Sequence, residues 1–84
     1  MGNKVLVRLY VPMIERKFEV WLPLNKRLCN IVKLLVKAID EFSRGYYKQE
    51  NLPSLYDKTT AKQYDLNLTI KDTNIRNGTE LILI

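Results

Sequence analysis

Residues 28–42 repeat their apolar side chains with the 3.6-residue period of an α-helix, and this is the strongest periodic signal in the chain. The opposite side of the segment mixes lysines with acidic residues, which is typical of a solvated helix face. One helix covers only one face of a sheet, so the rest of the chain must supply a sheet that fits under it. The apolar side consists of Leu28, Ile31, Val32, Leu35, Val36, Ala38, Ile39 and Phe42.

Segments on both sides of this helix alternate apolar and polar residues, a pattern typical of β-strands. The two runs before the helix lie four residues apart, which predicts a hairpin. Asn25 is predicted to cap the start of the helix and Gly45 its end. After the helix we expect Tyr46 and Tyr47 to pack over the rim of the core. The predicted elements are strands 4–11 and 16–22, helix 28–42, strand 55–57 with residues 63–64 pairing back, a helical turn at 69–73 and strand 79–84.

The order of these elements predicts an α+β roll, in which one long helix packs across one face of a mixed sheet. The first and last strands are expected to be central neighbours. They are also expected to be parallel, because a crossover containing the helix joins them. This is the element order of the β-grasp, or ubiquitin-like, fold. A chain of 84 residues has room for one such domain, which we assign to residues 1–84.

The chain contains no His and one Cys, which excludes several classes of chemistry. Without His there is no Ser-His or Cys-His pair for nucleophilic catalysis and no imidazole metal ligand. Cys29 alone forms neither an intrachain disulfide nor a multi-cysteine metal site, and its position in the helix indicates a small packing residue. We therefore expect no enzyme activity, no cofactor and no metal ion. No apolar run is long enough to span a membrane, so we expect a cytoplasmic protein.

The face of the predicted sheet that points away from the helix carries more apolar residues than a small monomer needs. Contiguous exposed apolar area usually marks an interface, and Trp, Tyr and Arg are frequent among binding hot spots. We therefore predict a protein-interaction surface, which also allows weak self-association. The alternative is a set of scattered surface hydrophobes, which are common on any protein. The predicted surface consists of Leu6, Arg8, Tyr10, Trp21, Tyr56, Ile82 and Ile84.

The last third of the chain, residues 68–83, resembles the T-L-x-D-x-x-I-x-x-x-x-x-L-x-L stretch of ubiquitin-like domains. Over residues 4–84 the chain is similar to the small bacterial YukD/EsaB-like proteins, which accompany the type VII (WXG100) secretion system of Gram-positive bacteria. This resemblance implies a cytosolic accessory protein that works through contacts with secretion-machinery proteins. The motifs behind it are L-Y-V-P at 9–12, L-P-L at 22–24, K-L-L-V-K-A at 33–38, L-Y-D at 55–57 and N-L-T-I-K-D-T-N-I-R-N-G-T-E-L-I-L-I at 67–84.

Two other functions are possible for a ubiquitin-like chain: conjugation or sulfur transfer through its C-terminus, and binding of nucleic acid. Protein modifiers and sulfur carriers need a flexible tail that ends in Gly-Gly, whereas this sequence ends in a predicted strand at Ile84. We therefore expect no conjugation and no sulfur transfer. The net charge of +5, together with Trp21 and the tyrosines, keeps a nucleic-acid-binding β-grasp domain as the alternative function. The basic residues are dispersed along the chain, which favours a protein partner over nucleic acid.

Overall fold

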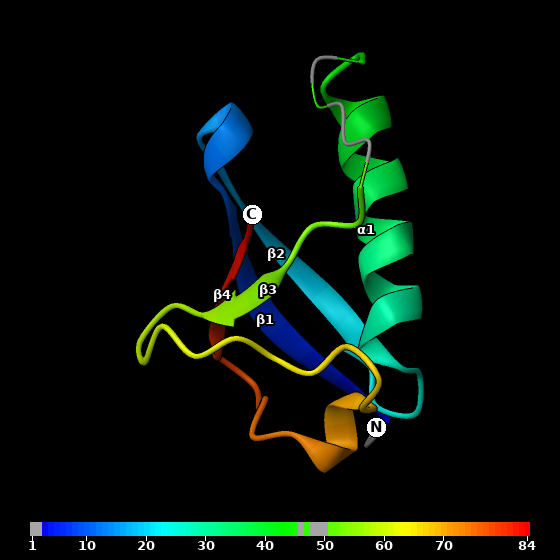
Figure 1. Ribbon diagram of the computed structural model, residues 1–84, viewed down its shortest axis with the longest axis vertical. Helices are drawn as coiled ribbons and strands as arrows, with labels where there is room; N and C mark the ends of the chain where they lie inside the picture. Colours follow the sequence, from blue (N-terminus) through cyan, green and yellow to red (C-terminus); the bar gives the residue numbers. More distant parts are fainter. Residues whose placement is uncertain (1–2, 46, 48–50) are drawn as a thin grey trace.

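The computed structural model describes residues 3–45, 47 and 51–84, and these form a sheet with one helix lying across it (Figure 1). The predicted α+β architecture is confirmed. The sheet has the strand order β2-β1-β4-β3. In chain order the elements are β1 (Lys4–Val11), the 3-10 turn η1 (Pro12–Ile14), β2 (Arg16–Pro23), α1 (Leu28–Phe42), β3 (Leu55–Asp57), the 3-10 turn η2 (Ile70–Asp72) and β4 (Glu80–Leu83).

Strands β1 and β2 form the predicted antiparallel hairpin, with Leu6 opposite Trp21. The chain reverses through η1, after which Glu15 adopts a left-handed conformation with φ 51° and donates its N–H to the carbonyl of Pro12. Strand β2 extends to Pro23, one residue further than predicted. A proline fits there because β2 is an edge strand and its missing N–H is on the side away from β1.

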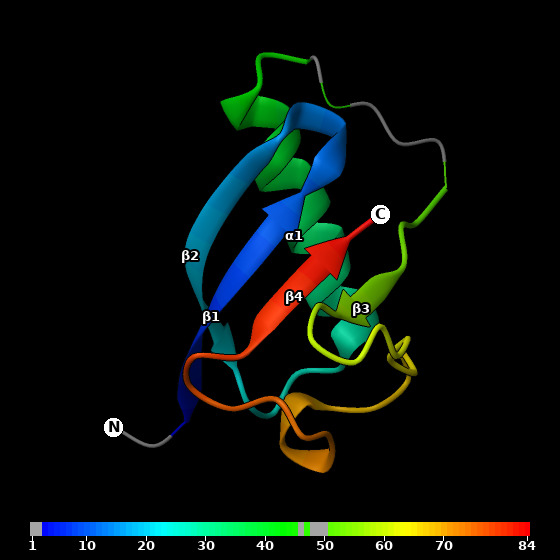
Figure 2. The ribbon, with the colours of Figure 1, turned by 90° about the vertical axis from the view of Figure 1, so that its left-hand side faces the viewer.

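Strand β4 lies between β1 and β3, parallel to the first and antiparallel to the second (Figure 2). The prediction that the first and last strands are parallel neighbours is therefore confirmed. The short strand β3 also has the predicted return pairing, since Gln63 bridges Tyr56 and the N–H of Tyr64 bonds to the carbonyl of Leu55. The sheet of the described residues thus extends from the open edge of β2 to the loop that follows β3.

The core lies between α1 and the inner face of the sheet, where every second residue of β1, β3 and β4 is buried, whereas in β2 only Leu22 is buried. Tyr47 is buried at 1% exposure, so it belongs to the core rather than to its rim. Tyr46, for which we expected the same rim packing, lies outside the described residues. The buried apolar residues are Val5, Val7, Leu9, Val11, Leu22, Leu28, Ile31, Val32, Ile39, Tyr47, Leu55, Ile70, Ile75, Leu81 and Leu83.

The start of α1 differs from the prediction that Asn25 caps it. Arg27 is the residue at the cap position, and it makes no side-chain hydrogen bond to the helix. Instead, the backbone carbonyls of Leu68 and Leu66 accept the N–H groups of Leu28 and Cys29, both at 2.8 Å. A distant loop therefore satisfies donors that a helix leaves free at its first turn.

The end of α1 follows the prediction more closely. Ser43 is at the cap position instead of the predicted Gly45, which lies two residues further on with φ 82°. The N–H of Gly45 donates to the carbonyl of Asp40 at 2.9 Å, as in a glycine-terminated helix. A side chain at this position would be strained by the positive φ, which accounts for the glycine.

We expect Leu81→Ala to lower the free energy of unfolding by about 2–5 kcal/mol, because Leu81 is fully buried in a central strand and its truncation leaves a cavity. Leu34→Ala is the matched control, since Leu34 is 56% exposed on α1 and should cost less than about 1 kcal/mol. Urea unfolding followed by circular dichroism measures both. Equal losses in the two variants would contradict the placement of the core.

Candidate protein-interaction surface

Figure 2 shows the outer face of the sheet, which α1 leaves uncovered. The strand register places one row of apolar side chains across this face. Tyr10 on β1 lies opposite Ile82 on β4, and Ile82 lies opposite Tyr56 on β3. All three are partly exposed, in alternation with buried neighbours on the same strands. The register therefore brings together three of the residues predicted from the sequence, although they come from three distant parts of the chain.

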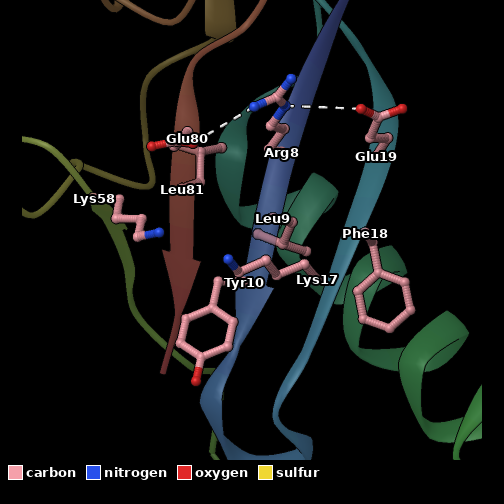
Figure 3. Close-up of a pocket in the computed structure, with 9 residues that line it drawn as sticks. All are labelled: Arg8, Leu9, Tyr10, Lys17, Phe18, Glu19, Lys58, Glu80 and Leu81. Atoms are coloured by element: carbon pink, nitrogen blue, oxygen red, sulfur yellow. Dashed lines mark ion pairs between the residues drawn. The ribbon is translucent and has the colours of Figure 1, made fainter.

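Arg8 occupies the centre of the same face and is held between two glutamates (Figure 3). Its Nε lies 3.7 Å from Glu19 Oε2, and its Nη1 lies 3.8 Å from Glu80 Oε2. All three side chains are well exposed, so these ion pairs add little to the free energy of unfolding. They matter for the surface, because they place a charged stripe beside the row of Tyr10, Ile82 and Tyr56.

The remaining predicted residues lie outside that row. Leu6 and Trp21 face each other across the hairpin, on the far side of the Arg8 stripe. Trp21 is 60% exposed on the edge strand. Ile84 is 61% exposed just after β4, where its backbone exchanges two hydrogen bonds with Ser54, at 2.8 and 3.0 Å. The other six predicted residues thus form two apolar areas, with the charged stripe of Arg8 between them, rather than one patch.

A shallow hollow of about 290 Å³ lies over this face and brings in two lysines. Lys17 comes from β2 and Lys58 from the residue after β3, and Figure 3 shows their side chains reaching toward the β1–β4 junction from opposite sides. Neither amino group has an ion pair within the described part of the chain. The hollow therefore combines the Tyr10 ring with two uncompensated positive charges.

Sequence reasoning identified Arg8 and the apolar members of this surface but missed its other charged residues, which are Lys17, Glu19, Lys58 and Glu80. The alternation of β1 placed Arg8 on the outer face, yet alternation within one strand does not give its register with the next. The structure shows that Arg8 lies opposite Glu80 in the sheet. It also shows that the Lys58 N–H donates to the Glu80 carbonyl, which places Lys58 beside the same pair. No local pattern in the sequence indicates that these charged residues lie close together.

A polar cluster fixes the loop that follows β3 and so positions Tyr56. The carboxylate of Asp57, which is buried, accepts the N–H groups of Thr59 at 2.8 Å and Thr60 at 3.3 Å. The hydroxyl of Tyr64 lies 3.2 Å from Asp57 Oδ2 and 2.9 Å from Asn74 Oδ1, so it shares its hydrogen between two acceptors. Burial, and then the charge and hydrogen bond of Asp57, raise the pKa of Tyr64 to about 12.

The described residues contain no cluster of His, Cys, Asp or Glu side chains placed to hold a metal ion. None of the helices in this part of the chain is long and apolar enough to cross a membrane. The outer face presents aromatic, aliphatic and ionic side chains.

Comparison with known proteins gives no match to a family model and none to a curated protein sequence. Solved structures do match. A chain of the MycP5-free ESX-5 inner membrane complex superimposes with a TM-score of 0.81 at 12% identity; the match covers 99% of this chain and 21% of that one. The EccD5 ubiquitin-like domain from Mycobacterium xenopi gives a TM-score of 0.80 at 13% identity, with 99% and 94% coverage.

The ubiquitin-like domain of the Mycobacterium tuberculosis type VII secretion system protein EccD1 gives a TM-score of 0.75 at 12% identity, covering 96% of this chain and 97% of that domain. The chain has the ubiquitin-like β-grasp fold. This chain corresponds to about a fifth of the ESX-5 component it matches and to almost all of the two isolated domains. At these identities the likeness establishes the fold alone.

We expect Tyr64→Phe to lower the free energy of unfolding by about 1–2 kcal/mol, because it leaves acceptors of Asp57 and Asn74 without a donor. Tyr10→Phe is the control and should change the free energy by less than about 0.5 kcal/mol, since the Tyr10 hydroxyl bonds to none of the described residues. Urea unfolding measures both, and equal effects would contradict a structural role for the Tyr64 hydroxyl.

We expect the Tyr64 hydroxyl to make the free energy of unfolding depend on pH. A raised pKa means that the folded state holds the Tyr64 proton more tightly than the unfolded state does. This contribution to the free energy of unfolding is therefore present below the unfolded pKa of about 10. It is lost as the pH rises through about 12. Spectrophotometric titration should show a tyrosine transition near pH 12 that is missing in Tyr64→Phe.

Proposed function

We propose that the chain is a non-enzymatic protein-interaction module that binds its partner through the outer face of its sheet. The observation that carries this proposal is the row of Tyr10, Ile82 and Tyr56 beside the hollow that Lys17 and Lys58 flank. Tyr supplies a large contact area at low cost in conformational entropy, and a rim of charged side chains is typical of specific interfaces.

The charges around the row suggest the chemistry of the partner. The glutamates at positions 19 and 80 are both engaged by Arg8, whereas Lys17 and Lys58 have no ion pair within the described ranges. A partner that presents an apolar side chain flanked by carboxylates would pack on the apolar row and pair with the two lysines. Charge complementarity of this kind mainly sets association rate and specificity.

We further propose that the partner belongs to a type VII secretion system. Two findings support this: the resemblance of the sequence to YukD/EsaB-like proteins and the structural likeness to ubiquitin-like domains of type VII secretion components. On this proposal the protein is a cytoplasmic accessory component of a Gram-positive system. Weak self-association through the same sheet face is compatible with it.

The proposal includes neither conjugation nor sulfur transfer through residues 83 and 84. Leu83 is buried in the sheet, and the backbone of Ile84 pairs with Ser54 in both directions. Activation of a terminal carboxylate requires a flexible glycine tail. Leu83 and Ile84 are instead large apolar residues held by the sheet. Detection of an adenylate or thioester at Ile84 with an activating enzyme would contradict this part of the proposal.

Ile82→Asp and Tyr56→Ala test the interaction surface, because both side chains are partly exposed and should be replaceable without loss of the fold. We expect each variant to lose most of its partner in affinity purification from the native cell followed by mass spectrometry. Leu52→Asp is the matched control, since Leu52 is exposed before β3 and lies outside the surface. Circular dichroism verifies that all three variants are folded.

The outcomes of this experiment distinguish the proposed surface from the alternatives. Secretion-system proteins that bind the wild type and the control, but not the two surface variants, support the proposal. Binding that the surface variants leave unchanged would overturn the surface. Recovery of nucleoproteins, with a mobility shift of RNA or DNA that weakens steeply as salt rises, would favour the nucleic-acid alternative instead.

A further inference from the structure

Three large apolar side chains are exposed along one side of the molecule, where β2 and α1 lie next to each other. Trp21 on β2 is 60% exposed, and Leu34 and Phe42 on α1 are 56% and 53% exposed. Trp21 and Leu34 border the same shallow groove between the strand and the helix. In Figure 2, β2 forms one edge of the sheet, and the last turns of α1 lie beside it. We call these three residues the lateral apolar set.

The members of this set are spread along the molecule rather than gathered in one pocket. Leu34 and Phe42 are two turns apart on α1, which is about 12 Å along the helix axis. Ala38, one turn from each, is also exposed. The ring of Phe42 is held against β2, because it meets the Phe18 ring edge to face with centroids 5.4 Å apart. Two packed elements therefore fix the positions of the set.

The charge of this side of the molecule is strongly positive. Residues 16–44, which run from β2 through α1, contain seven Lys and Arg against three Asp and Glu, so they hold four of the five net positive charges of the chain. All seven basic side chains are exposed, and none has an ion pair within the described ranges. One of the acidic residues, Glu19, is already engaged by Arg8. The basic residues are Arg16, Lys17, Lys26, Arg27, Lys33, Lys37 and Arg44.

Some of these charges lie directly beside the lateral apolar set. The guanidinium of Arg16 lies 4.9 Å from the centre of the exposed Phe42 ring. Lys37 follows Leu34 by three residues, so the two share one side of α1. Glu41 is the acidic exception, since it is exposed on the same side one turn further along. Long basic side chains can pack their stems on apolar surface and keep their charge in water, which suits a boundary between apolar and polar media.

We propose that this side of the molecule docks reversibly on an anionic lipid surface. Trp21, Leu34 and Phe42 enter the boundary between headgroups and acyl chains, where Trp is especially favoured. The surrounding basic side chains contact lipid phosphates and add electrostatic attraction to a negatively charged leaflet. A few inserted apolar side chains bind weakly on their own, so attachment needs both parts. The domain lies on the bilayer and does not cross it.

A lipid surface fits this side better than a second copy of the chain. Two copies docked through it would each bring the same excess of positive charge, and like charges in contact oppose association. A rigid partner would also have to match apolar side chains that lie two helical turns apart, whereas fluid headgroups adapt to their spacing. This side is separate from the outer-face row, so the proposal does not depend on the role of that row.

The test uses the full chain and two kinds of vesicle, one of phosphatidylcholine alone and one in which about a third of the lipid is the anionic phosphatidylglycerol. Trp21 is the single tryptophan of the chain, so its fluorescence reports directly on the proposed site. We expect the protein to sediment with the anionic vesicles, less so as salt rises, and its Trp21 emission to shift to shorter wavelength. Neutral vesicles should cause neither effect.

Two matched pairs of variants test insertion and charge separately. Leu34→Glu should weaken binding to anionic vesicles at least about tenfold, whereas Leu52→Glu, which places the same charge at an exposed leucine before β3, should weaken it less than about threefold. Lys37→Glu should weaken binding at least about fivefold, whereas Lys62→Glu, an equal change of net charge after β3, should weaken it less than about threefold. Circular dichroism confirms the fold of each variant.

A further variant should change binding in the opposite direction. Glu41→Lys replaces the acidic exception beside Leu34 with a positive charge, so we expect it to strengthen binding to anionic vesicles at least about fivefold. Damage to the fold cannot produce such a gain. Unchanged or weaker binding of a folded Glu41→Lys protein would contradict the placement of the lipid against this side of α1.

The proposal is overturned if the protein does not bind anionic vesicles at millimolar lipid, if neutral vesicles bind it equally, or if Lys37→Glu and Lys62→Glu weaken binding equally, because net charge alone then explains it. It is also overturned if Trp21 emission is unchanged on the vesicles, or if sedimentation without lipid shows a dimer that Leu34→Glu dissociates. Ile82→Asp leaves this side intact, so that variant should still bind anionic vesicles, which separates this result from the proposed function.

Discussion

The insertion of β4 between β1 and β3 is the constraint on which the rest of the structure depends. Parallel strands cannot be joined by a tight turn, so the chain must cross the sheet between β1 and β4, and α1 makes that crossing. Leu9 and Leu81, opposite each other in the two strands, then face the helix and are fully buried. The same pairing turns Tyr10 and Ile82 to the outer face, so the core and the candidate surface are consequences of one register.

The local pattern of the sequence predicted the elements well, because burial on one side alone produces the alternation in β1 and the 3.6-residue period in α1. The local pattern did not predict the features that depend on contacts between distant segments. Asn25 is a good cap residue, yet the backbone carbonyls of Leu66 and Leu68 take that role. The meeting of Arg8 with Glu80 likewise depends on a register between strands that are far apart in sequence, which no local pattern contains.

The outer face of the sheet and its β2 edge differ in the groups that they expose. The outer face presents side chains alone, since β1 and β4 are central strands whose backbone groups are already paired. An apolar groove between β2 and α1 lies at the edge of the sheet, where β2 pairs with β1 alone. Trp21 stands where the two surfaces meet, opposite Leu6 on one side and beside Leu34 on the other.

The carbonyl groups that cap the start of α1 have a consequence for how the molecule opens. Leu28 and Cys29 receive their partners from the loop of Leu66 and Leu68, not from the helix or from a neighbouring side chain. The first turn of α1 and this loop therefore form one cooperative unit, although residues 30–65 separate them in the sequence. Amide protons at the start of the helix exchange with solvent only when the loop detaches, so their exchange rate reports the integrity of the distant segment.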